Sequence, residues 1–122
     1  LFLKKVEDPE SFGIAWLGDD GRIISIREKP REPDSNLAIT GLYLYTSKVF
    51  DIIDKSIDEV GYSDRGELEI SDINRFFMER REARGIEFDG HWADCGTINA
   101  LLETSVLMKE WKKGEWLVSR GS

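Results

Sequence analysis

Segments typical of β-strands alternate with segments typical of α-helices along the 122 residues of this chain. The first signal is a hairpin: residues 12–17 are apolar and aromatic, residues 18–21 (Gly-Asp-Asp-Gly) have turn chemistry, and residues 22–28 alternate. A second apolar segment, residues 37–45, predicts another strand, and Gly41 inside it marks either a bulge, a close approach of ligand or backbone, or a packing adjustment.

The remaining signals predict helices and one more strand. Two segments carry apolar residues at helical spacing: Phe50, Ile53 and Ile57 in one, and Ile70, Ile73 and Phe77 in the other. Ser47 can cap the first of these helices. A short strand runs from Gly85 through Phe88, and Thr97 can cap a last helix that Gly114 ends. Since each amphipathic helix needs a sheet to cover, the sequence predicts an α/β fold.

Composition excludes several classes of protein. No linker or repeat divides the chain, so it forms one unit. With 24 acidic against 17 basic residues the net charge is -7, which disfavours a nucleic acid polymer as partner. The apolar runs fall far short of the ~20 residues of a membrane-spanning helix.

The lone Cys95 forms no internal disulfide and no signal peptide is visible, so we expect a cytoplasmic protein. The chain opens on Leu1 as if already inside a strand, which we interpret as a fragment or a processed chain.

Glu28 and Lys29 form the first candidate site. Period-two alternation places Ile24, Ile26 and Glu28 on one face of a strand, so Glu28 falls in the apolar phase, where a buried carboxylate needs a partner or ligand. Pro30 is expected to hold Lys29 in an extended conformation and to end the strand. A carboxylate for sugar hydroxyls beside an ammonium for a phosphate suits a phosphosugar. Two solvated charges at a frayed strand end are the alternative, which this segment alone favours.

Two further segments carry candidate residues. Arg65 can contact a phosphate through its fork of donors, whereas Glu67 and Glu69 are interpreted as helix-entry charges. Asp94 precedes a glycine turn and a helix, and it is equally well interpreted as a magnesium ligand or as a turn residue. Cys95 is interpreted as structural. No glycine-rich phosphate loop, dinucleotide fingerprint, nucleophile elbow or zinc-protease motif occurs, so the residues alone indicate only an anionic-ligand site.

Five segments, taken in order, resemble the second half of the sugar-1-phosphate nucleotidylyltransferases, and within them the glucose-1-phosphate thymidylyltransferase type. The segments are residues 6–14 (Val-Glu-Asp-Pro-Glu-Ser-Phe-Gly-Ile), residues 28–30 (Glu-Lys-Pro), residues 35–43 (Ser-Asn-Leu-Ala-Ile-Thr-Gly-Leu-Tyr), residues 65–72 (Arg-Gly-Glu-Leu-Glu-Ile-Ser-Asp) and residues 92–97 (Trp-Ala-Asp-Cys-Gly-Thr). The resemblance runs from about Val6 to the last helix.

The resemblance implies a nucleotide-diphosphosugar transferase fold, a mixed and mainly parallel Rossmann-like sheet flanked by helices. It implies that residues 1–122 are the C-terminal, sugar-phosphate-binding half of a nucleotidyltransferase domain, with the N-terminal nucleotide-binding half absent. In such enzymes an oxygen of the sugar-1-phosphate, here glucose-1-phosphate, attacks the α-phosphorus of a nucleoside triphosphate, here dTTP, and pyrophosphate leaves. The chain alone is expected to be inactive, and to associate with its missing half or with a second copy.

The resemblance also assigns roles to individual residues. It implies that Lys29 and Arg65 contact the sugar phosphate and that Glu28 binds the sugar hydroxyls. The backbone at Gly13 and Ile39 would line the sugar pocket, with Tyr43 as a nearby wall. Asp94 would bind Mg²⁺. Three residues depart from the family pattern: Arg27 replaces an acidic residue, and Ala93 and Cys95 replace the more usual Leu and Thr.

Two alternatives from other classes stay open. One is a non-catalytic phosphosugar-binding or assembly module that keeps the pocket without the chemistry. The other is a structural fragment that becomes ordered only beside its missing half, for which an exposed sheet edge and apolar face predict dimerisation, domain swapping or aggregation.

Overall fold

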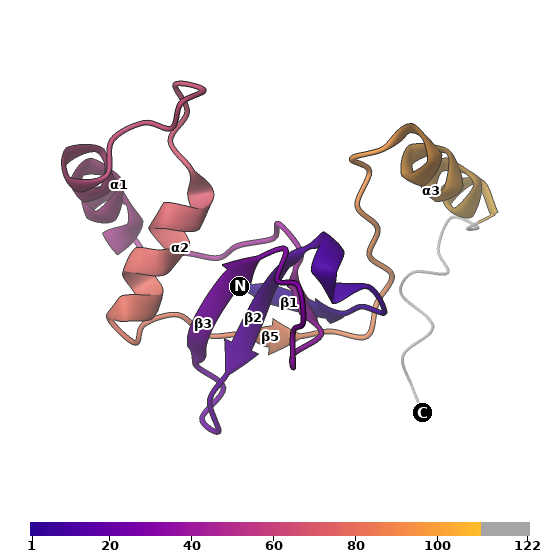
Figure 1. Cartoon of the computed structure of the whole chain (residues 1–122), viewed down its shortest axis with the longest axis horizontal. Coiled ribbons are helices and arrows are strands. Elements are labelled where there is room, and N and C mark those ends of the chain that lie inside the picture. Colours follow the sequence, from indigo (N-terminus) through magenta and orange to yellow (C-terminus); the bar gives the residue numbers. More distant parts are fainter. Residues whose placement is uncertain (111–122) are drawn as a thin grey trace. The chain divides into compact units, whose positions relative to one another are not determined.

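The computed structural model describes residues 1–110. The sequence predicts one unit, whereas the structure divides into two compact units, Leu1–Asp89 and Gly90–Ser122 (Figure 1). The first unit contains, in order, β1 (Phe2–Lys5), a 3₁₀ turn η1 (Pro9–Ser11), β2 (Gly13–Leu17), β3 (Ile23–Glu28), β4 (Leu37–Ile39), α1 (Lys48–Glu59), α2 (Ile70–Glu79) and β5 (Ile86–Glu87). The described part of the second unit contains α3 (Ile98–Glu110). The α/β prediction is confirmed.

The five strands form one sheet in the order β3-β2-β4-β1-β5. The predicted hairpin is confirmed as the antiparallel pair β2–β3. The pairs β2–β4 and β1–β4 are also antiparallel, and only β1–β5 is parallel. The expectation of a mainly parallel sheet is therefore wrong for the described residues. Only β2 and β3 are joined by a short connection. The antiparallel partners β1 and β4 are separated by residues 6–36, and the parallel partners β1 and β5 by a longer segment that includes both helices.

Strand β3 contains a bulge that the alternating pattern did not predict. Trp16 pairs with Ser25 and Leu17 pairs with Ile23, so Ile24 is the extra residue. The side chain of Ile24 is 64% exposed, whereas that of Ile23 is 2% exposed. The prediction that Ile24 shares the face of Ile26 is wrong, because the bulge shifts the phase between them.

The strand predicted over residues 37–45 is shorter than expected. Strand β4 ends at Ile39, and Gly41 has a φ of 80°, in the left-handed region that glycine adopts readily. The backbone N–H of Phe2 donates to the Leu42 carbonyl (3.1 Å) beyond this point. The Phe2 carbonyl also accepts the backbone N–H of Thr40 (3.2 Å), so Phe2 bonds to the chain on both sides of Gly41, as at a bulge, after the regular strand ends at Ile39.

The two helices of the first unit pack on the sheet through one core. The core comprises Leu3, Ala15 and Ile23 from the strands, Ile52, Ile73 and Phe77 from the helices, and Ala83. The predicted helical stripes are confirmed at Ile73 and Phe77 but not at Phe50 and Ile70, which are exposed. Ile14 and Ala38, which alternate with the core residues of their strands, are also fully buried, so both faces of the central strands are covered.

Of the two predicted N-caps, Ser47 and Thr97, only Thr97 makes a capping hydrogen bond. Ser47 occupies the N-cap position of α1 but makes no side-chain cap hydrogen bond. In the second unit, the Thr97 Oγ1 accepts the backbone N–H of Ala100 (3.1 Å), which confirms the predicted cap of α3. The predicted helix end at Gly114 lies outside the described residues. Within residues 1–110, no helix has the length and apolar character needed to cross a membrane.

Candidate functional site

Three of the predicted pocket residues lie in one row across the sheet. Glu28 on β3 pairs directly with Gly13 on β2. The β2–β4 register pairs Ile14 with Ala38, and continuing it by one residue places Gly13 opposite Ile39. Period-two alternation puts this row on the same face as the core residue Ala15. The structure therefore brings Glu28, Gly13 and Ile39 together at the carboxyl end of β3.

Gly13 allows the Glu28 carboxylate to lie against the backbone of β2. A Cβ atom built on Gly13 would lie 2.9 Å from the Glu28 Oε2. Glu28 itself is exposed, so the desolvation cost that its position in the sequence suggested does not arise. Its carboxylate oxygens remain accessible to hydroxyl donors from solvent or from a ligand.

Lys29 adopts a conformation opposite to the one predicted. Its φ is 42°, in the left-handed region, although a residue before proline normally avoids compact conformations. Its backbone N–H donates to the Phe12 carbonyl (3.0 Å), which fixes the chain as it leaves β3. A left-handed conformation costs a non-glycine residue about 1–2 kcal/mol. Such strain is common where a side chain is held for a functional purpose.

The negative charge of Glu28 acts on Tyr43, the residue predicted as a wall of the pocket. Burial raises the pKa of Tyr43, a hydrogen bond with Asn74 opposes this shift, and the negative charge of Glu28 adds to it. The Tyr43 ring stacks on Tyr45 with ring centroids 6.0 Å apart, and Tyr45 stacks on Phe77 at 5.4 Å. The Tyr43 ring is therefore linked through Tyr45 to the core residue Phe77.

Asn74 and Tyr45 are neighbours of the site that the sequence analysis missed. Asn74 is 3% exposed, and its Oδ1 accepts the Tyr45 hydroxyl (2.6 Å). Burial and the neighbouring Tyr43 raise the pKa of Tyr45 to about 12. The available signal was the polar Asn74 directly beside Ile73 and three residues before Phe77, within the apolar stripe of α2.

Arg65 lies in the loop between α1 and α2 (Figure 1) and is engaged by carboxylates. Its Nη2 lies 2.9 Å from the Glu69 Oε1 and 3.6 Å from the Glu67 Oε2. The hydrogen bond with Glu69, then the charges of Glu69 and Glu67, raise the pKa of Arg65. Within residues 1–110, no recorded hydrogen bond or ion pair joins Arg65 to Glu28 or Lys29. Its contact with a phosphate stays a prediction.

Asp94 is exposed and belongs to the second unit. Its Oδ1 accepts the backbone N–H of Gly96 (3.2 Å), as expected of a turn residue. The other carboxylate oxygen suits one vertex of a magnesium shell that water and phosphates complete. Within residues 1–110, no cluster of three or more His, Cys, Asp or Glu side chains could hold a metal by itself. Cys95 is exposed, with its Sγ 3.7 Å from the Thr104 Oγ1.

The first unit also contains a cavity of about 480 Å³. Its lining includes Tyr45, Asn74 and Phe77, but none of the predicted site residues. The hydrogen-bonded pair Tyr45–Asn74 therefore lines the cavity, whereas Tyr43 does not. We assign the candidate site to the Glu28 row because three of the predicted site residues lie together there and Lys29 directly follows Glu28 along the chain.

The chain matches known nucleotidyltransferases over most of its length. The family model described as nucleotidyl transferase matches residues 1–110. The bifunctional protein GlmU of Methanocaldococcus jannaschii is 36% identical over 103 residues, which cover 84% of this chain and 24% of that relative. Glucose-1-phosphate thymidylyltransferase of Streptomyces griseus is 35% identical over 111 residues, covering 90% of this chain and 30% of that relative.

A solved structure supports the same relationship. A provisionally assigned glucose-1-phosphate thymidylyltransferase from Bacillus anthracis, in complex with sucrose, has a TM-score of 0.74 and 43% identity to this chain. The match covers 93% of this chain and 44% of that one. The chain thus spans from a quarter to under a half of the length of these three proteins. By its sequence, and by the fold that carries the Glu28 row, the chain belongs to the nucleotidyl transferase family.

Proposed function

We propose that this chain supplies the sugar-phosphate side of a nucleotidyltransferase active site. In the complete reaction a phosphate oxygen of glucose-1-phosphate forms a bond to the α-phosphorus of dTTP. The bond from that phosphorus to the bridging oxygen breaks, and pyrophosphate leaves with the electron pair. The observation that carries the proposal is the row of Glu28, Gly13 and Ile39, which Lys29 follows at the end of β3 and Tyr43 flanks.

Each side chain has a distinct part in binding. The exposed Glu28 carboxylate accepts hydrogen bonds from sugar hydroxyls, and Gly13 keeps the space that this carboxylate occupies. The Lys29 ammonium, on a backbone fixed by its bond to Phe12, meets the phosphate. Arg65 joins it when the phosphate replaces Glu69 as the partner of the guanidinium. These groups orient the attacking phosphate and offset its charge, which are the main demands of phosphoryl-type transfer.

Magnesium is the proposed metal of the complete site. Asp94 contributes one carboxylate oxygen, and when bound the ion offsets negative charge on the phosphates. The chain itself has no glycine-rich phosphate loop. We therefore place the triphosphate site outside these residues, and we expect the isolated chain to bind sugar phosphate in the cytoplasm without catalysing transfer.

Binding is tested by titrating the 122-residue chain with glucose-1-phosphate while its amide NMR spectrum is recorded. We expect shifts at Gly13, Glu28 and Ile39. Lys29→Ala should weaken binding by about tenfold, the equivalent of about 1.4 kcal/mol. Lys55→Ala, which removes an exposed lysine paired with Glu59 on α1, is the matched control and should bind normally.

Two simpler ligands separate the two ends of the site. Inorganic phosphate should bind more weakly to Lys29→Ala but equally to Glu28→Gln, whereas glucose should show the reverse dependence. A spectrum that ignores glucose-1-phosphate, or that responds identically in Lys29→Ala, would overturn the proposal.

A second candidate is a phosphosugar-binding module that keeps the Glu28 row but takes no part in transfer. The two are distinguished by adding the preceding part of the parent protein, where one exists, and measuring pyrophosphate release from dTTP and glucose-1-phosphate. Release by the 122-residue chain alone would contradict its expected inactivity.

A further inference from the structure

The loop that follows Lys29, residues 30–36, is fastened to strand β2 by side-chain hydrogen bonds. The Trp16 Nε1 donates to the Asp34 Oδ1 (2.5 Å). The Ser35 hydroxyl donates to the Ala15 carbonyl (2.7 Å) and accepts the backbone N–H of Leu37 (3.4 Å). Two consecutive loop residues are thus fastened to two consecutive residues of β2.

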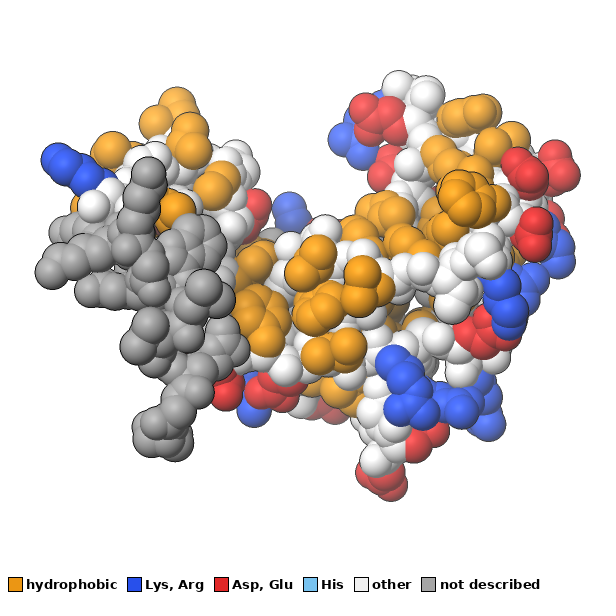
Figure 2. Space-filling view, turned by 180° about the vertical axis from the view of Figure 1, so that it is seen from behind, with side chains coloured by type: hydrophobic (Ala, Val, Ile, Leu, Met, Phe, Trp, Pro, Cys, Tyr) orange, Lys and Arg blue, Asp and Glu red, His pale blue; other side chains and the backbone are white. Residues whose placement is uncertain are grey.

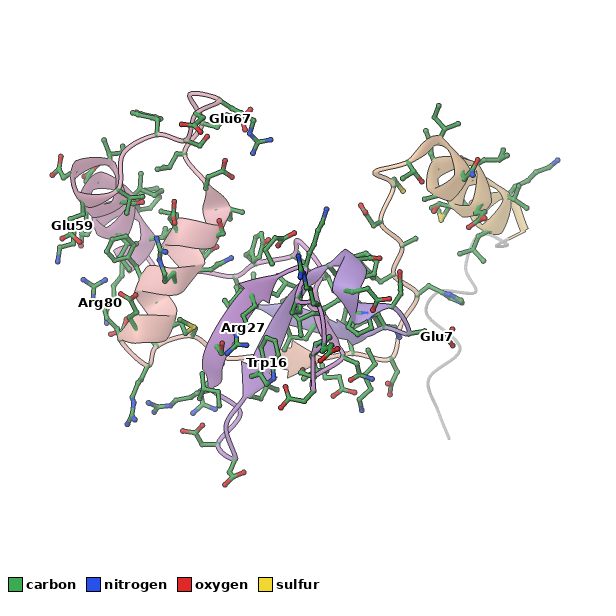
Figure 3. All side chains as sticks on the ribbon, in the orientation of Figure 1. Glu7, Trp16, Arg27, Glu59, Glu67 and Arg80 are labelled. Carbon is green, nitrogen blue, oxygen red and sulfur yellow. The ribbon has the colours of Figure 1, made fainter. Side chains whose placement is uncertain are left out.

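Arg27 completes this arrangement on the strand that leads to Lys29. Its guanidinium carbon lies 5.2 Å from the centre of the Trp16 ring, as the two labelled side chains in Figure 3 illustrate. The pairing of Arg27 with Ile14 places Arg27 and Trp16 on the same face of the sheet, opposite the face of Glu28. The hydrogen bond from Trp16, the backbone of Asp34 itself and the charge of Arg27 lower the pKa of Asp34. Ring, cation and carboxylate therefore form one connected group.

We propose that Trp16, Arg27 and Asp34 form a clamp that positions Lys29 for sugar-phosphate binding, an inference that rests on the proposed function. The Lys29 backbone is strained, with a φ of 42° before a proline. A strained residue persists only where its surroundings over-determine it. Strand β3 fixes the chain before Lys29, and the clamp fixes it after Lys29. Without the clamp the loop is held to β2 only from Ser35 onward, and Lys29 relaxes toward the extended conformation that residues before proline prefer.

The clamp uses residues that the site itself does not need. Arg27 stands where the family that this chain resembles usually has an acidic residue. A carboxylate at that position could not make the cation–π contact that Arg27 makes with the Trp16 ring. Trp16, Arg27 and Asp34 are thus positioning residues, since they act through the loop and its attachment to β2.

The test uses three substitutions and one control in the full chain. Trp16→Phe keeps a ring under Arg27 but removes the indole N–H, and Asp34→Ala removes the acceptor. Asp34→Asn keeps an acceptor oxygen and should restore function. Asp54→Ala removes an exposed aspartate from α1 and controls for the lost charge.

Two quantities are measured: the dissociation constant of glucose-1-phosphate and the hydrogen exchange of the Lys29 amide, which is bonded to Phe12. We expect Trp16→Phe and Asp34→Ala to bind about five- to tenfold more weakly, the effect of losing about one hydrogen bond. The Lys29 amide should exchange faster in both variants, while the thermal midpoint of unfolding falls by no more than about 5 °C. Asp34→Asn and Asp54→Ala should behave as the unsubstituted chain.

The outcomes separate the clamp from the proposed function. Unchanged exchange of the Lys29 amide in Trp16→Phe and Asp34→Ala would overturn the clamp, whatever the ligand does. Unchanged binding in these variants, with binding still lost in Lys29→Ala, would overturn the clamp and leave the proposed function standing. An unsubstituted chain that does not bind glucose-1-phosphate would instead overturn the proposed function.

Discussion

Gly13 determines how closely the Glu28 carboxylate approaches strand β2. A methyl group at this position would lie 2.9 Å from the Glu28 Oε2, the flexible end of that side chain, so the carboxylate would swing away while the fold survives. We therefore expect Gly13→Ala to change the free energy of unfolding by less than about 1 kcal/mol but to weaken glucose-1-phosphate binding by about tenfold.

The matched control is Gly18→Ala, at the other end of β2, where a Cβ atom would meet the Asp20 and Ile24 side chains at 3.3 Å. Urea denaturation and NMR titration measure the two quantities. Equal binding by both variants would contradict a role for the space above Gly13.

Tyr45 predicts a pH dependence at the alkaline end. Its folded-state pKa is raised to about 12 from an ordinary 10.0, so the folded protein holds the phenolic proton more tightly than the unfolded chain does. The resulting stability is fully present below pH 10 and is lost as the pH rises through the folded-state value. Between these values, the free energy of unfolding should fall more steeply with pH in the unsubstituted chain than in Tyr45→Phe. Identical slopes in urea denaturation across this range would count against the assignment.

At the scale of elements, the bulge in β3 distinguishes two adjacent isoleucines. Ile23→Ala removes side-chain atoms from a 2% exposed core position and should cost about 2–4 kcal/mol of unfolding free energy. Ile24→Ala removes the same atoms from a 64% exposed side chain and should cost less than about 0.5 kcal/mol. Urea denaturation measures both losses, and each variant serves as the control for the other. A larger loss of unfolding free energy in Ile24→Ala than in Ile23→Ala would contradict the bulge.

Elements whose signals are local were predicted well. The hairpin of β2 and β3 follows from four turn residues between two apolar segments, and the cap of α3 follows from Thr97 alone. The bulge at Ile24 was not predictable, because it depends on how β2 and β3 pair over the core. The early end of β4 had a visible signal in Gly41, which we interpreted as a feature within a longer strand.

The candidate site was predictable to the extent that strand register determines it. Glu28 and Gly13 come together because they pair across one hairpin. The left-handed Lys29 was not predictable, since the local preference before proline is extended and the loop contacts of Ser35 and Asp34 are tertiary. Asn74 was missed because the burial of a polar residue in a helical stripe cannot be explained until its hydrogen-bond partner, here Tyr45, is known.

At the scale of the whole molecule, residues 1–110 expose many large hydrophobic side chains. Hydrophobic side chains gather on the face of the first unit that Figure 2 shows. Leu42 and Leu44, which follow Gly41, are 55% and 74% exposed. Exposed apolar surface of this kind marks interfaces or promotes association. We expect the chain to self-associate at micromolar to millimolar concentrations in sedimentation velocity experiments.

Leu44→Asp should shift this association to higher concentration by removing apolar surface and adding a charge. Thr46→Asp adds the same charge to a nearby exposed position without removing apolar surface, and it should shift the association less. A chain that sediments as a monomer throughout the concentration range would contradict this prediction.

Lys29 places folding and binding in conflict at one position. Glycine adopts a φ of 42° without the steric penalty that a lysine incurs, so selection for stability alone favours glycine there. A library randomised at position 29 and selected for resistance to heat should therefore be enriched in glycine and asparagine. The same library selected for retention on immobilised sugar phosphate should be enriched in lysine. The two selections would measure how much stability this lineage has given up in order to keep a cation at the end of β3.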